Sequence, residues 1–113
     1  MGRLEKMIKK NNKYGAVKTT VDGIVFDSKR EAVRYMELMV LQKNGQISRL
    51  ELQPKYDCII NGKKICTYRA DFRYFTKDRR IVEDVKGVKT PVYILKKKLV
   101  EALYAGVIIQ EIK

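Results

Sequence analysis

Val82-Glu83-Asp84-Val85-Lys86-Gly87, taken together with the earlier stretch Tyr68-Arg69-Ala70-Asp71-Phe72-Arg73-Tyr74, decides the fold of this chain. Successive side chains of an extended strand alternate between its two faces, so Asp84 and Lys86 are expected on one face and Glu83 on the other. If the two stretches pair through a turn at residues 76–78, Asp71 and Asp84 converge beside Lys86. Two close carboxylates repel unless a cation lies between them, and hard oxygen ligands select magnesium-like ions.

The earlier stretch belongs to a predicted strand over residues 65–75 that also alternates. One face is predicted to form core, and it carries Cys66, Tyr68, Ala70, Phe72 and Tyr74. The other face carries Ile65, Thr67, Arg69, Asp71 and Arg73. Asp71 is thereby predicted to lie away from the core.

Size and charge indicate one small domain with a polyanionic partner. A chain of 113 residues can build one hydrophobic core but not two, so we expect a single domain over residues 14–113. The 25 Lys and Arg against 13 Asp and Glu give a net charge of +12, and residues 1–13 resemble a basic arm that is either a solvated tail or a phosphate contact. Because no apolar run is long enough for a membrane span or a secretory signal, we expect a cytoplasmic protein with no membrane partner.

Histidine is absent from the chain, which excludes catalytic centres that depend on it and leaves carboxylate, lysine and tyrosine chemistry. The two cysteines, Cys58 and Cys66, lie on either side of the turn signal Asn61-Gly62 and are expected as reduced, partly buried thiols. A structural zinc site is therefore not expected.

The remaining elements follow from turn signals and apolar spacing. Asp22-Gly23 predicts a hairpin between residues 19–21 and 24–26. A helix is expected from Ser28 to Asn44, with a core stripe of Ala32, Met36, Met39 and Val40 and with Glu31, Tyr35, Leu38 and Gln42 on one margin. Strands are expected over residues 47–60 with an interruption near Pro54, then over 65–75 and over 80–86, and a last one over 107–112.

A second helix is expected to begin at Thr90-Pro91, with the threonine as its N-cap. Its predicted core positions are Val92, Leu95, Leu99, Ala102 and Leu103. The elements together predict an α/β fold in which a mixed β-sheet is flanked by helices in the order αβββαβ, after the small β-hairpin.

Glu31 on the first helix, Asp71 on one strand and Asp84-Val85-Lys86 on the next resemble the three stations of the PD-(D/E)XK nuclease superfamily. Residues 26–32, 53–56 and 82–91 are more specifically similar to a small phage- and prophage-associated branch of that superfamily. The chain departs from the family pattern at Ala70, which stands where proline gives the superfamily its name. The resemblance implies a restriction-endonuclease-like core, encoded by a phage or prophage in a bacterial host.

The resemblance also implies the site. Asp71 and Asp84 would bind Mg²⁺, for which Mn²⁺ substitutes, and the carbonyl of Val85 would add an oxygen. Lys86 would hold or deprotonate the attacking water, and Glu31 would complete the site directly or through water. The candidate DNA contacts are Lys55, Arg69, Arg73, Tyr93, Lys96 and Lys97.

Each of these residues also has an ordinary structural reading. Asp71 between two arginines fits an ion-pair ladder, and Asp84 with Lys86 fits an exposed same-face pair. Ser28-Lys29-Arg30-Glu31 is a capping-box pattern that accounts for the glutamate without catalysis. The lysine run 96–98 fits a solvated helix face, and Glu83 is a competing ligand that alternation turns away.

These features together predict a metal-dependent DNA endonuclease that acts as a homodimer, with branched DNA such as a Holliday junction as the expected substrate. A minimal domain has little surface for reading base sequence, so recognition of DNA shape is easier to support. The alternatives are a non-catalytic basic nucleic-acid-binding protein on the same fold, a nicking or end-processing nuclease, and an unrelated resolvase that uses clustered aspartates.

Overall fold

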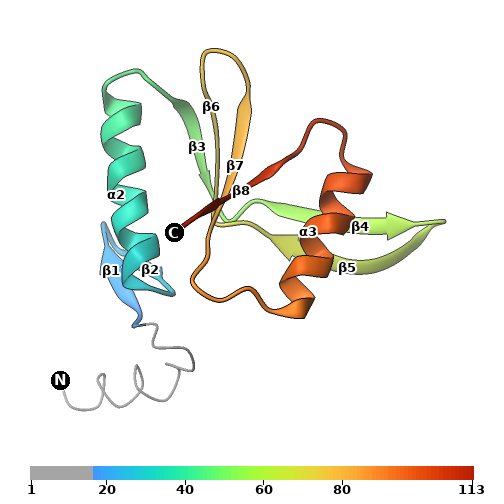
Figure 1. Ribbon diagram of the computed structural model, residues 1–113. Coiled ribbons are helices and arrows are strands. Elements are labelled where there is room, and N and C mark those ends of the chain that lie inside the picture. The colour runs from blue at the N-terminus through green and yellow to red at the C-terminus, as the bar shows by residue number, and fades with distance from the viewer. Residues whose placement is uncertain (1–16) are drawn as a thin grey trace. The chain divides into compact units, whose positions relative to one another are not determined.

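The computed structural model describes residues 17–113, which fall into two compact units, residues 17–39 and residues 40–113. Helix α2 (Lys29–Lys43) begins in the first unit and ends in the second. Each unit is described by itself below, with the elements labelled as in Figure 1. The basic arm predicted for residues 1–13 lies outside the described residues.

The first unit is a hairpin packed on the start of a helix. Strands β1 (Thr19–Val21) and β2 (Ile24–Phe26) pair antiparallel. The turn residues Asp22 and Gly23 have φ values of +53° and +75°, as a two-residue hairpin turn with matching twist requires. The hydroxyl of Tyr35 donates to Asp22 over 3.2 Å, and its ring lies 5.0 Å from that of Phe26. These contacts attach the hairpin to α2.

The buried face of α2 differs from the predicted core stripe. The buried side chains are Glu31, Ala32, Tyr35 and Leu38, whereas Met36, Met39 and Val40 are exposed, Val40 to 59%. Three of the four predicted stripe positions were therefore wrong. The buried face follows the spacing i, i+4, i+7 from Glu31, because Tyr35 rather than the methionines makes the contact with the hairpin.

The second unit contains a four-stranded mixed sheet with the order β3-β6-β7-β8 (Figure 1). Its strands are β3 (Ser48–Leu52), β6 (Phe72–Phe75), β7 (Arg80–Val85) and β8 (Ile109–Ile112). Neighbouring strands are antiparallel except for β7 and β8, which are parallel and are connected through helix α3 (Pro91–Leu103). For residues 17–113, the α/β class with a mixed sheet and two helices is confirmed.

A separate two-stranded sheet is formed by β4 (Lys55–Ile60) and β5 (Lys63–Arg69). Its turn uses Asn61 and Gly62 at positive φ, +51° and +77°. Cys58 and Cys66 are register partners across this hairpin and are free thiols, as expected. Burial raises the pKa of the Cys58 thiol to about 11, which keeps it protonated.

Five strands lie between the two helices instead of three, because two predicted strands are each divided. The first breaks at Gln53-Pro54, where an interruption was expected and where Gln53 has a φ of +52°. The second breaks at Ala70-Asp71, which the sequence did not predict. The breaks are bonded to each other, since the Gln53 amide donates to the Asp71 carbonyl over 2.9 Å and the Ala70 amide donates to the Pro54 carbonyl over 3.1 Å. The chain thus passes between the two sheets at one paired position.

Helix α3 starts as predicted and buries a different face. The Thr90 hydroxyl accepts a hydrogen bond from the Tyr93 amide over 3.1 Å, and Pro91 follows in the first turn. Tyr93 and Val100 are the buried side chains, and they join a core cluster with residues of β4 and β5. The predicted stripe is correspondingly wrong: Leu99 is partly buried, and the other members, Val92, Leu95, Ala102 and Leu103, are exposed.

The packed face of α3 is the one that carries part of the lysine run. The Lys96 ammonium donates to the carbonyl of Thr67 on β5 over 3.1 Å, and the Tyr104 hydroxyl donates to the carbonyl of Asp57 on β4 over 2.7 Å. Tyrosine and lysine side chains fill this contact with their apolar bodies while their polar ends reach main-chain carbonyls. Within residues 17–113, neither helix has the length and apolarity of a membrane-spanning segment.

Candidate active site

Strand β7 presents two buried carboxylates on opposite faces. Asp84 is 2% exposed and Glu83 is 1% exposed. The Lys86 ammonium lies 3.3 Å from a carboxylate oxygen of Asp84, whereas Glu83 accepts a hydrogen bond from the hydroxyl of Tyr74. Asp84 and Lys86 therefore share a face and Glu83 points the other way, as strand alternation predicts.

Asp71 lies opposite Asp84 at the end of the β6–β7 ladder. Phe72 is the register partner of Glu83, which makes Asp71 and Asp84 the next opposed pair. The Asp71 amide still donates to the Glu83 carbonyl over 3.1 Å, but its carboxylate accepts from the Val85 amide over 2.7 Å. The Asp71 side chain thus accepts a hydrogen bond that a main-chain carbonyl would accept in a regular ladder, and regular pairing of β6 with β7 ends here.

Val85 directs its main chain toward Asp71. In a strand, the amide and carbonyl of one residue point to the same neighbouring strand. The Val85 amide donates to Asp71, while the Lys86 amide donates to Ile112 on the other side over 2.9 Å. The carbonyl of Val85 accordingly lies on the edge where Asp71 lies, as a third oxygen ligand would need to.

Tyr68 is a site residue that the sequence did not indicate. Its hydroxyl donates to the second carboxylate oxygen of Asp84. Burial, followed by the charge of Asp84, raises the pKa of Tyr68 far above its usual value, so the hydroxyl stays a neutral donor. Alternation placed Tyr68 and Asp71 on opposite faces. The strand is interrupted at Ala70-Asp71, so the alternation of faces does not continue from Tyr68 to Asp71. No local sequence feature predicts this interruption.

Glu111 is a second residue that sequence analysis missed. It is the register partner of Asp84 on the parallel strand β8. Its carboxylate accepts from the Tyr93 hydroxyl over 2.8 Å and pairs with Lys89 over 2.8 Å, and these contacts lower its pKa, Lys89 most. The Lys86 ammonium lies 4.3 Å from the centre of the Tyr93 ring, within reach of a cation–π contact. The sequence feature that could have indicated Glu111 was the crossover through α3, because a helical crossover implies that the next strand lies parallel to β7.

Asp71, Asp84 and Glu111 form a row of carboxylates across three neighbouring chain segments. Among residues 17–113, however, no three acidic, cysteine or histidine side chains gather closely enough to hold a metal ion. Mg²⁺ is commonly held by one or two carboxylates together with water and substrate phosphate. Asp71, Asp84 and the Val85 carbonyl fit that donor set, because all are hard oxygen ligands on one edge.

Glu31 lies in the first unit and is described with it alone. Its amide donates to the Ser28 hydroxyl over 3.1 Å, which is one half of the capping box that the sequence predicted. The main chain of Glu31 thus has a structural role at the start of α2. A role for its carboxylate in metal binding stays a prediction.

Two of the candidate DNA contacts are exposed cations that face each other. Lys55 and Arg69 are register partners at one end of the β4–β5 sheet, and both are exposed. Like charges placed directly opposite each other destabilise a sheet. An anion bound between Lys55 and Arg69 would remove that repulsion.

The other four candidates make contacts within the protein. Arg73 pairs with Glu51 and lies over the Tyr56 ring, and its hydrogen bond to Glu51 is the main cause of its raised pKa. Tyr93 is buried. Lys96 is bonded to a carbonyl, and Lys97 lies 3.8 Å from Glu111 and 4.0 Å from Glu101. Each would have to give up a contact, or in the case of Tyr93 become exposed, to reach DNA.

Comparison with curated proteins and with solved structures found no match. A family described as protein of unknown function (DUF1064) matches residues 11–113, which is nearly the whole chain. The match includes both buried carboxylates of β7, the paired strand breaks and helix α3. The chain therefore belongs to the DUF1064 family.

Proposed function

We propose that the protein is a metal-dependent DNA endonuclease that hydrolyses phosphodiester bonds. The observation that carries the proposal is the opposition of Asp71 and Asp84 where the β6–β7 ladder ends, with the Lys86 ammonium 3.3 Å from Asp84. Hydrolysis of a phosphodiester needs a deprotonated water, neutralised phosphoryl oxygens and a stabilised leaving oxygen. Two carboxylates at opposed ladder positions, with an ammonium beside one of them, supply the groups for that chemistry.

Each residue has a distinct part in the proposal. Asp71, Asp84 and the Val85 carbonyl would hold a Mg²⁺ or Mn²⁺ ion, which would supply charge neutralisation and lower the pKa of a water. Lys86 is partly exposed, so its ammonium can orient the attacking water and contact a phosphate oxygen. Tyr68 acts as a positioning residue, because its hydroxyl fixes the Asp84 carboxylate in one rotamer.

The substrate side of the proposal rests on charge. A net charge of +12 on 113 residues favours binding of a polyanion, and the opposed pair Lys55 and Arg69 offers a place for phosphate.

One site per chain cuts one strand, so resolution of branched DNA needs two copies, and we include a homodimer in the proposal. The exposed apolar side chains of α3, Val92 and Leu95 among them, are a surface that a second copy can cover.

The proposal is tested by incubating the pure protein with linear, flapped, single-stranded and four-way DNA, in Mg²⁺ or Mn²⁺ and in chelator. We expect cleavage with either ion, fastest on four-way DNA, and none in chelator. Cleavage of linear and flapped DNA alone would leave a nicking or end-processing nuclease. Absence of cleavage on every substrate would remove the enzymatic proposal. Light scattering with and without four-way DNA tests the homodimer, since a protein that stays monomeric in both contradicts it.

A non-catalytic nucleic-acid-binding protein is the second candidate, and a specific observation favours it. Both carboxylate oxygens of Asp84 already have partners, Tyr68 and Lys86. A buried aspartate satisfied in this way is also a stable structural arrangement. DNA binding that is indifferent to Mg²⁺, without cleavage of any substrate, would identify this second function.

A further inference from the structure

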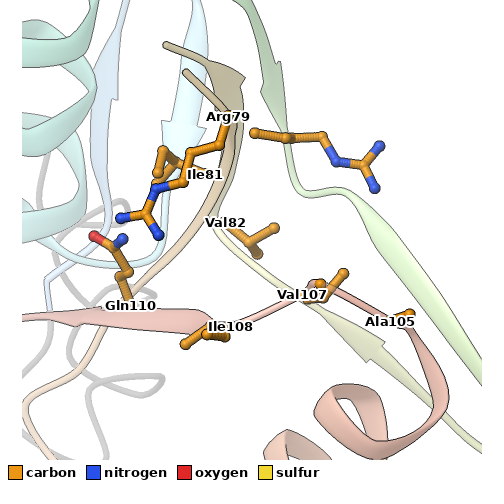
Figure 2. Close-up of a pocket in the computed structure, with 9 residues that line it drawn as sticks. Arg79, Ile81, Val82, Ala105, Val107, Ile108 and Gln110 are labelled. Carbon is orange, nitrogen blue, oxygen red and sulfur yellow. The ribbon is translucent and has the colours of Figure 1, made fainter. Parts of the chain in front are cut away.

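A pocket of about 200 Å³ lies at the start of β7, away from the carboxylate row and within the second unit. Figure 2 shows its walls. They come from the β6–β7 turn, from the start of β7, from the segment between α3 and β8, and from β8 itself, and they include Arg79, Arg80, Ile81, Gly106, Ile108 and Gln110. The function proposed above uses none of these residues.

The charge of the pocket is positive and largely uncompensated. Two of its lining residues are arginines and none is acidic. In the part of the chain that the structure describes, neither arginine forms an ion pair. The pKa of the Glu51 carboxyl is lowered chiefly by its hydrogen bond from Arg73, and the charge of Arg80 adds to this. Arg79 is therefore the more available cation. Figure 2 shows its guanidinium pointing toward the side-chain amide of Gln110.

The turn that carries Arg79 is held in place by its own hydrogen bonds. The Thr76 amide donates to the Arg79 carbonyl over 2.8 Å, and the Arg79 amide donates to the Thr76 hydroxyl over 3.2 Å. A guanidinium on a fixed main chain presents its planar donors at a defined place, which suits bidentate binding of a phosphate.

Size and wall chemistry restrict the ligand. Pockets for drug-sized ligands usually measure about 300–1,000 Å³, so 200 Å³ is too small for a dinucleotide cofactor and sufficient for a fragment of one nucleotide. Ile81, which alternation places on the same face as Arg79, and Ile108, which is 67% exposed, form the apolar wall. Such a wall suits the sugar or the base of a nucleotide, while Arg79 and Gln110 provide donors for its phosphate.

We propose that this pocket binds one nucleotide unit of a nucleic-acid strand, with the phosphate on Arg79 and the sugar or base against the apolar wall. The proposal rests on the proposed function for the identity of the polymer. Arg79 and Asp84 are five residues apart along the extended chain, or about 17 Å, which corresponds to about five nucleotides along a B-form strand at 3.4 Å each, and alternation turns them to opposite faces of the sheet. The pocket would hold the substrate at a second point beyond the cleavage site.

The test follows main-chain amide signals of the full chain by NMR during titration with a deoxynucleoside 5′-monophosphate. The unphosphorylated nucleoside and inorganic phosphate serve as separate arms. We expect saturable shifts at Gly106 and Gln110 with the monophosphate, and at least about tenfold weaker binding by the other two ligands. Arg79→Gln should weaken binding of the monophosphate about tenfold, because it removes a charge-assisted contact. Lys77→Gln is the matched control, since Lys77 is an exposed cation on the same turn that does not line the pocket.

Three results would overturn this inference: no saturable shift at the pocket amides, equal binding of phosphate and nucleotide, or equal losses in Arg79→Gln and Lys77→Gln. Failure of the pocket and failure of the nuclease are distinguishable. Asp84→Asn, which should abolish cleavage, should leave nucleotide binding in the pocket unchanged. A protein that cleaves DNA without binding the monophosphate here would retain the proposed function and lose only the second site.

Discussion

Replacing Asp84 by Asn should remove the response of the protein to divalent ions, and replacing Glu83 by Gln should not. The two residues are matched controls for each other. Both are buried carboxylates on β7, and each accepts a hydrogen bond from a tyrosine hydroxyl, Tyr68 for Asp84 and Tyr74 for Glu83. They differ in the face they occupy, since only Asp84 lies opposite Asp71 and beside Lys86.

The size of each effect follows from these contacts. Either substitution removes a charged acceptor from a buried hydrogen bond, which costs about 1–3 kcal/mol of folding free energy. Both variants should therefore unfold at lower temperature than the wild type in chelator. Metal binding adds a separate contribution. For a dissociation constant of about 1 mM, 10 mM ion stabilises the folded state by about 1.4 kcal/mol, or about 6–11 °C for a domain of this size.

The assay is thermal unfolding of the wild type and both variants in chelator and in 10 mM Mg²⁺ or Mn²⁺. The wild type and Glu83→Gln should gain stability with the ion, and Asp84→Asn should gain none. Equal ion-induced shifts in the two variants would refute the assignment of the metal to the Asp84 face. Absence of any shift in the wild type at saturating ion would refute metal binding at Asp71 and Asp84.

Three further predictions concern other parts of the second unit. Alkylating reagents at pH 8 should label Cys66 before Cys58, because Cys58 is buried and its raised pKa of about 11 leaves about one molecule in a thousand as thiolate; equal labelling rates in the folded protein would contradict this. Stability should fall as the pH rises above about 10, the usual pKa of tyrosine, because the unfolded chain releases the Tyr68 proton that the folded protein retains. Urea titrations from pH 9 to 11 should show a shallower fall for Tyr68→Phe, and an identical slope would show that Tyr68 is not responsible. Lys55→Gln with Arg69→Gln should weaken metal-free DNA binding and reduce the slope of log affinity against log salt by about 2, and an unchanged slope would mean that these cations do not contact phosphate.

The face assignments on β7 could be predicted because this strand is continuous. Residues 80–85 form one unbroken strand, so alternation from Asp84 to Glu83 holds without correction. The same rule failed for Tyr68, because the chain changes sheets between β5 and β6. The positive φ at Gln53 and the hydrogen bonds that join the two breaks are tertiary features that strand periodicity does not encode.

The helices show a different limit. Helix α3 has an apolar stripe at core spacing, yet its packed face is centred on Tyr93 and Val100. Hydrophobic periodicity predicts the buried face of a helix from its most apolar positions. The packed face of α3 instead uses tyrosine rings and lysine methylene groups, and the polar ends of Lys96 and Tyr104 donate to main-chain carbonyls. In α2, likewise, the contact between Tyr35 and the hairpin selects the face. The start of α3 was predicted more reliably, because the N-cap Thr90 and Pro91 determine it through contacts within the first turn.

Glu111 could not be placed beside Asp84 without the register of β8. Only the crossover through α3 determines that these strands run parallel and that Asp84 faces Glu111. A predicted order of elements gives no register between neighbouring strands. The ion pairs of Glu111 with Lys89 and Lys97 were hidden from the sequence for the same reason.

Cleavage and binding of one DNA substrate by the wild type and by Lys86→Ala test the catalytic assignment most directly. Lys86 is one of 25 basic residues, so its loss changes the overall field little, but its ammonium lies 3.3 Å from a carboxylate oxygen of Asp84. We predict a fall in the cleavage rate in Mg²⁺ of about 100-fold or more, the usual effect of removing a positioned acid, base or charge, with DNA affinity in chelator nearly unchanged. Equal, small losses in both quantities would make Lys86 an ordinary phosphate contact and would contradict the proposed active site.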